Sequence, residues 1–191
     1  MDDLFPVLPF RASLYAPEEL FDGFRADDPT SYARTPDLRA YRSTRLPPNR
    51  EVGMLRALHD QCMTEARDEL IAGRRVVAIM GGHAMARTDQ SYRQVATMAA
   101  RLTGRGDLLT SGGGPGAMEA THLGALLSPN GPDALDAALA TLAAEPAFPT
   151  GAGAVVAQGG AIDRAVLESL HRWQAPAFAV LDSIALDLRG Q

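Results

Sequence analysis

A glycine-rich stretch, Ser111-Gly112-Gly113-Gly114-Pro115-Gly116-Ala117-Met118-Glu119, is the part of the sequence best suited to chemistry. Glycine lets the backbone take positive φ and approach a ligand closely, and the first N–H groups of a helix attract anions. The pattern therefore predicts a phosphate-binding loop formed by Gly112, Gly113, Gly114 and Gly116, with a hydroxyl from Ser111 or Thr110. The alternative is a strand-to-helix turn without a ligand, but four glycines exceed what such a turn needs.

A second glycine pair, Gly81-Gly82, precedes His83 and follows another apolar run. We expect both glycine segments at the carboxyl edge of one parallel sheet, where α/β proteins bind ligands. His83 is expected either to contact a phosphate or base, or to bond the backbone of its own loop. Arg87 is a candidate phosphate ligand, with capping towards solvent as the alternative.

Two titratable residues follow on the segment that should be a helix. Glu119 is open to three interpretations: a carboxylate favoured by the helix dipole, a hydrogen bond to a ribose hydroxyl, or a brace of the loop. A carboxylate is repelled by phosphate, so a ligand-facing Glu119 must point at the sugar. His122 is expected to pack rather than to catalyse.

The spacing Gly112-x-Gly114-x-x-Ala117 also fits the dinucleotide pattern G-x-G-x-x-A. Such domains need an acidic residue at the end of the next strand, about 20 residues further on. Asp133 and Asp136 lie instead in a helical segment that prolines interrupt. An NAD(P)-binding domain is therefore only a distant alternative.

Composition excludes several classes of function. The 191 residues carry a net charge of −5, which gives no electrostatic basis for binding nucleic acid or an anionic membrane. All 18 basic residues are arginine, which excludes a Walker P-loop and a pyridoxal phosphate site, since both need lysine. The single cysteine, Cys62, should be a buried or half-buried thiol on a helix, without a disulfide partner in the chain. We predict no cofactor and no metal.

The N-terminal part of the sequence suggests an appendage. It has no signal-peptide core, and the chain lacks an apolar run of about 18 residues, so we expect a cytoplasmic protein. Residues 1–50 hold seven prolines and seven aromatic residues, which predicts an extended arm packed on the main domain or on a neighbouring subunit. Arg39, Arg42 and Arg45 are expected on a solvated or inter-subunit face.

Residues 51–191 should form the nucleotide-binding domain. Hydrophobic periodicity predicts helices near residues 50–72 (capped by Asn49), 88–102, 115–127 (with Pro115 first), 133–144 and 162–173. Apolar runs predict strands at 76–80, 107–110, 154–157 and 177–181. This alternation is typical of an α/β fold, and we predict a Rossmann-like three-layer sandwich with a mostly parallel sheet. Residues 183–191 offer no covering helix, so the sheet should be incomplete at its C-terminal end.

At these motifs the chain resembles the LONELY GUY family, also described as "lysine decarboxylase-like" or Rossmann-fold nucleotide-binding proteins. The matching segments are Ala78-Ile79-Met80-Gly81-Gly82-His83 and Thr110–Gly124, and the resemblance covers residues 74–127 best. It is closest to the longer bacterial nucleotide 5′-monophosphate nucleosidases. The resemblance implies a homo-oligomer that binds a nucleoside 5′-monophosphate such as AMP, or another phosphorylated small molecule. It also implies phosphoribohydrolase activity, which releases the base and ribose 5-phosphate.

Active members of the family carry a second loop, P-G-G-x-G-T-x-x-E, whose glutamate is assigned the catalysis. The nearest segment here is Gly159-Gly160, which follows Gln158, and Val166 stands where the glutamate belongs. Asp163 or Glu168 would have to replace that glutamate, so the catalytic residue is unknown, with Glu119 and Glu168 as weak candidates. We therefore expect binding without hydrolysis. The chain would be an N-terminal portion of a longer protein, a degenerate member, or a nucleotide-sensing module without catalysis.

Overall fold

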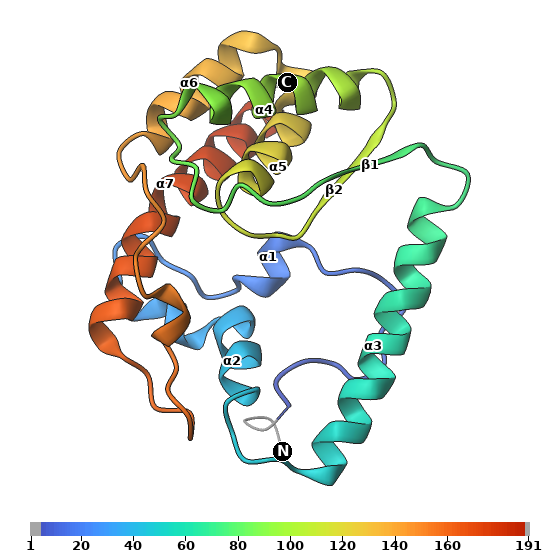
Figure 1. The fold of residues 1–191 in the computed structure, drawn as a ribbon, viewed down its shortest axis with the longest axis vertical. Helices are drawn as coiled ribbons and strands as arrows, with labels where there is room; N and C mark the ends of the chain where they lie inside the picture. Colours follow the sequence, from blue (N-terminus) through green and yellow to red (C-terminus); the bar gives the residue numbers. More distant parts are fainter. Residues whose placement is uncertain (1–4, 190–191) are drawn as a thin grey trace. The chain divides into compact units, whose positions relative to one another are not determined.

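The computed structural model describes residues 5–189, with side chains as far as Ile184. The chain divides into two compact units (Figure 1). Unit 1 comprises Met1–Ala72 and Gly151–His171, and unit 2 comprises Gly73–Thr150 and Arg172–Gln191. Helix α7, Arg164–Arg189, begins in unit 1 and continues in unit 2. Unit 1 thus extends well past residue 50, because the long helix Arg50–Ile71 belongs to the same unit as the N-terminal segment.

Unit 2 is built on a strand–helix–strand motif. Strands β1 (Val76–Ile79) and β2 (Leu108–Ser111) are parallel, with Val76 opposite Leu108 and Ile79 opposite Ser111. Helix α4 (Gln90–Gly104) connects them. The predicted strands and the helix between them are confirmed. The unit combines several helices with a small parallel sheet, which is compatible with the predicted α/β class.

Helix α5 (Ala117–Leu127) lies beside α4 (Figure 1). Gly124 permits this close packing, because a Cβ there would lie 2.0 Å from the carbonyl oxygen of Ala96 and 2.9 Å from the Cβ of Ala99. The short 3₁₀ helix η2 (Ser128–Asn130) and helix α6 (Pro132–Leu142) follow. Tyr92 and Leu142 are the largest fully buried side chains of the core that these helices share. Burying each such side chain contributes about 1.5–3 kcal/mol.

Two of the predicted strands are wrong. Residues 154–157 begin with the last residue of the short 3₁₀ helix η3 (Ala152–Ala154), and the one bridge they form in the described part of the chain is antiparallel, from Val156 to Ile162. Residues 177–181 lie inside α7, whose Pro176 does not end it. A short apolar run fits a buried helix as well as a buried strand. Within residues 5–189 the sheet consists of β1 and β2, and the three-layer sandwich stays a prediction.

The predicted extended arm contains three short helices. Residues 5–50 contain α1 (Pro17–Leu20), the 3₁₀ helix η1 (Ser31–Arg34) and α2 (Pro36–Ser43). Pro17 and Pro36 occupy first helical positions, where the missing N–H costs nothing, so these prolines start helices. The Thr35 hydroxyl caps α2 by accepting a hydrogen bond from the Leu38 N–H at 3.3 Å.

Unit 1 has its own core, in which Tyr32 stacks on Phe21 with ring centroids 6.0 Å apart. Helix α3 (Arg50–Ile71) is capped by Asn49, whose side-chain oxygen accepts from the Val52 N–H at 3.1 Å, as predicted. Cys62 is buried on this helix, also as predicted. No helix in the described part of the chain is both long and apolar enough to cross a membrane.

Candidate functional site

The two glycine segments of unit 2 meet at the carboxyl ends of β1 and β2. The Gly82 carbonyl accepts hydrogen bonds from the Met85 N–H at 3.0 Å and the Ala117 N–H at 3.3 Å. A Cβ on Gly116 would lie 2.0 Å from that carbonyl oxygen, and a Cβ on Gly82 would lie 2.7 Å from the Ala117 Cβ. Both glycines are therefore needed for the loops to touch, as the predicted common edge requires.

The glycines at positions 112, 113, 114 and 116 are accommodated for different structural reasons. Gly113 and Gly116 both have φ of 72°, which L-residues rarely adopt. Gly112 and Gly114 do not have a positive φ. A Cβ on Gly112 would lie 3.1 Å from the Met118 Sδ, and one on Gly114 would lie 2.6 Å from the Met118 Cε. The backbone thus explains Gly113 and Gly116, whereas Gly112 and Gly114 leave space beside the Met118 side chain.

The start of α5 determines which N–H groups a ligand can use. The helix begins at Ala117 with Gly116 as its N-cap, so the prediction that Pro115 is its first residue is wrong. The Ala117 N–H is bound to Gly82, and the Gly113 N–H donates to the Ser111 Oγ at 3.2 Å. Met118 and Glu119 follow in the first turn, where N–H groups have no acceptor within the helix. These two N–H groups are the donors that α5 itself offers to an anion.

Arg87 is bound to protein groups on several sides. Its side chain is 1% exposed and forms an ion pair with Glu119, with Nη2 2.5 Å from Oε1. Nε donates to the same carboxylate, and Nη1 donates to the carbonyls of Glu145 (3.1 Å) and Trp173 (2.9 Å). The guanidinium carbon lies 4.1 Å from the centre of the Trp173 ring. Such a side chain supports the fold, and it is not a cap towards solvent.

Glu119 completes the same network. The hydroxyl of the fully buried Tyr92 donates to its Oε2 at 3.0 Å. Burial raises the pKa of Tyr92, and the neighbouring Glu119 carboxylate raises it further. Of the three interpretations of Glu119, the brace agrees best with these bonds. The sequence pattern does not reveal the contacts of Tyr92 and Trp173 with this network, because their polar partners are far away in the sequence.

Two histidines of this region differ in their surroundings. His83, after Gly82, is exposed. His122 is exposed as a residue, yet its Nε2 lies 2.9 Å from the Ser111 Oγ. Desolvation lowers the pKa of the His122 imidazole. Sequence reasoning missed this pair, although a serine at a strand end followed by a histidine on the next helix was the available signal.

The candidates for the second loop lie in unit 1. The Gly160 carbonyl accepts from the Arg42 Nε at 2.8 Å, and the Gly159 N–H donates to the Arg45 carbonyl at 2.9 Å. Arg42 and Arg45 thus contact this loop and do not serve only as a solvated face. Asp163 caps α7 by accepting from the Val166 N–H, and Glu168 pairs with Arg164 at 2.9 Å.

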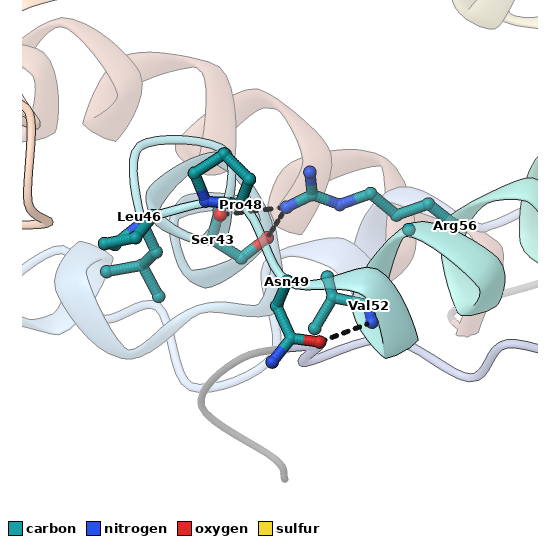
Figure 2. A pocket seen from close by; sticks show the side chains of 8 residues that line it. Ser43, Leu46, Pro48, Asn49, Val52 and Arg56 are labelled. Carbon is teal, nitrogen blue, oxygen red and sulfur yellow. Dashed lines mark hydrogen bonds between the residues drawn. The ribbon is translucent and has the colours of Figure 1, made fainter.

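Unit 1 also contains a small cavity of about 180 Å³ between α2 and α3 (Figure 2). Arg56 lies at its side and donates to the Ser43 carbonyl at 2.8 Å and to the Ser43 Oγ at 3.1 Å. Leu46, Pro48, Asn49 and Val52 also line it. None of the predicted ligand-binding residues is among these, so the cavity is no part of the candidate phosphate site.

The chain was compared with protein-family models, with curated proteins and with solved structures, and it matches none of them. The resemblance to the LONELY GUY family therefore depends on the glycine motifs quoted above.

Proposed function

We propose that the glycine loop of unit 2 binds the phosphate of a nucleoside 5′-monophosphate or of a similar small molecule. The observation that carries the proposal is the position of the loop. It runs from the end of β2 into α5 and holds two glycines, Gly112 and Gly114, that its backbone conformation does not require. Ligands of parallel α/β sheets bind at this edge, and a helix N-terminus favours an anion there.

The contacts divide the predicted ligand-binding residues into two groups. Ser111, the glycines 112–114, Met118 and the exposed His83 remain candidates for ligand contacts. Gly82, Gly116 and Ala117 hold the two loops together. Arg87 and Glu119 brace the loop from the core. In this proposal the phosphate is bound mainly by backbone N–H groups, without an arginine.

Glycosidic hydrolysis, which the family resemblance implies, is the weaker proposal. An oxocarbenium-like transition state needs a carboxylate near the anomeric carbon. The Glu119 carboxylate is instead bound to Arg87 and Tyr92, and Glu168 is paired with Arg164. These partners favour a nucleotide-binding module without hydrolysis. A Rossmann-like sandwich, a cytoplasmic location and a homo-oligomer belong to the same proposal.

Calorimetry of AMP binding tests the proposal. Gly114→Val should weaken binding at least about tenfold, equal to about 1.4 kcal/mol, because the new side chain would displace the Met118 side chain at the start of α5. Gly153→Val is the matched control, since a Cβ on Gly153 has open space around it. Equal affinity of the Gly114→Val variant and the parent would mean that the loop is only a turn.

A further inference from the structure

Ser111 and His122 form a side-chain pair at the start of the glycine loop. Ser111 is the last residue of β2, and His122 lies in the second turn of α5. Their Oγ and Nε2 atoms are 2.9 Å apart. A nucleophile and its general base need a separation of about 2.6–3.2 Å, so the pair has the spacing for nucleophilic catalysis.

The protonation state of His122 suits a base. Its pKa is lowered, and desolvation is the cause. β1, β2 and η2 carry no acidic or basic side chain, and none of the charged residues of α4 and α6 contributes to the shift, namely Arg93, Arg101, Asp133 and Asp136. The imidazole is therefore neutral at pH 7, and with its proton on Nδ1 it accepts the Ser111 hydroxyl proton at Nε2.

The surroundings of the Ser111 oxygen add two features. The Gly113 N–H donates to Oγ at 3.2 Å, and the hydroxyl lies 3.5 Å from the Met118 carbonyl oxygen, so these two backbone groups hold the Ser111 side chain in place. Ser111 is half-buried and His122 is exposed, so a small solute can reach the pair.

We propose that Ser111 is a nucleophile and His122 its general base, in a site that accepts small activated carboxylic esters. Oγ attacks the ester carbonyl carbon while its proton passes to Nε2 of His122. The bond to the leaving alkoxide breaks, and His122 gives the proton to that alkoxide. Water then gives a proton to Nε2 of His122 and attacks the acyl carbonyl carbon. The bond between that carbon and Oγ breaks, Oγ takes the proton from His122, and the carboxylic acid leaves. This activity goes beyond the proposed nucleotide binding and shares Ser111 with it.

p-Nitrophenyl acetate is the probe, used with the full chain. We expect a burst of p-nitrophenolate with one acetyl group per chain, and peptide mass spectrometry should place it on Ser111. Ser111→Ala should abolish the burst, and His122→Gln should slow it about 10²–10⁴-fold, the usual contribution of a general base. Ser91→Ala and His59→Gln, a serine and a histidine outside the pair, should leave the burst unchanged.

Absence of acetyl on Ser111, or an unchanged burst rate in His122→Gln, overturns the proposal. Circular dichroism shows whether His122→Gln is folded. If it is not, the pH profile of the parent decides. The burst rate should rise as His122 loses its proton, with an apparent pKa below about 6.5, whereas a profile without this step overturns the proposal.

Discussion

The carbonyl oxygen of Gly82 lies 2.0 Å from the position that a Cβ on Gly116 would occupy. Only glycine fits at residue 116, both for this reason and because its φ is 72°. The same carbonyl accepts the Ala117 N–H. The loop after β1 is thereby fixed to the first residue of α5, and this contact sets the geometry of the proposed phosphate site.

Gly116→Ala should therefore destabilise the protein more than Gly113→Ala. Both residues have φ of 72°, and an alanine at such a φ is strained by roughly 1–3 kcal/mol. An alanine at position 116 would also collide with the Gly82 backbone, which costs about a further 1–3 kcal/mol of stability. A Cβ on Gly113 meets nothing within 4 Å. Urea denaturation gives both free energies of unfolding. Equal losses would mean that the two loops are not in contact.

The Arg87–Glu119 pair should be strongly coupled. Removing one partner of a buried ion pair leaves an unpaired charge and costs about 3–5 kcal/mol. We expect this loss for Arg87→Met and for Glu119→Gln, because the Arg87 side chain is 1% exposed. The double variant should lose less than the sum of the single losses by about 1–3 kcal/mol. Additive losses in urea denaturation would contradict a direct pair.

His122 should make stability depend on pH. Its folded pKa is lowered by desolvation, so the unfolded chain binds this proton at a higher pH than the folded chain does. The contribution is complete above the unfolded value of about 6.5 and is lost as pH falls towards the folded pKa. His122→Gln should flatten the stability profile between pH 7.5 and pH 5 relative to the parent. Identical slopes for the two proteins would exclude the shift.

AMP incubated with the chain should yield little or no adenine. The Glu119 carboxylate is bound to Arg87 and Tyr92, and a missing general acid or base usually costs about 10²–10⁴-fold in rate. Chromatography detects the free base. Robust release by the parent would show that another carboxylate acts. Release that Glu119→Ala abolishes, with AMP binding retained, would assign the catalysis to Glu119.

Sequence patterns predicted the regular elements of unit 2 well. The strands β1 and β2 and the helices around them have strong periodicity and glycine ends. In unit 1, the Asn49 cap of α3 was predicted as well. The errors fell on segments where local signals are ambiguous. The apolar runs 154–157 and 177–181 are too short to distinguish a strand from a helix. Pro17 and Pro36 act as helix starters, which proline counting alone does not reveal.

Only those parts of the site whose residues lie close together in the sequence could be predicted. The glycine loop and the Gly81-Gly82 pair can be recognised from spacing, and the structure brings them together through Gly82 and Ala117. The partners of Arg87 come from residues 119, 145 and 173. A contact between such distant residues depends on tertiary packing, so the sequence left the roles of Arg87 and Glu119 open.

An NMR titration of the ¹⁵N-labelled chain with AMP tests the central claim most directly, because it reports on each backbone N–H of the loop. We predict that AMP and ribose 5-phosphate shift the signals of Gly112–Glu119, with large shifts at Met118 and Glu119, and that adenosine leaves them nearly unchanged. Shifts confined to other residues, or equal shifts with adenosine, would contradict a phosphate site at the start of α5.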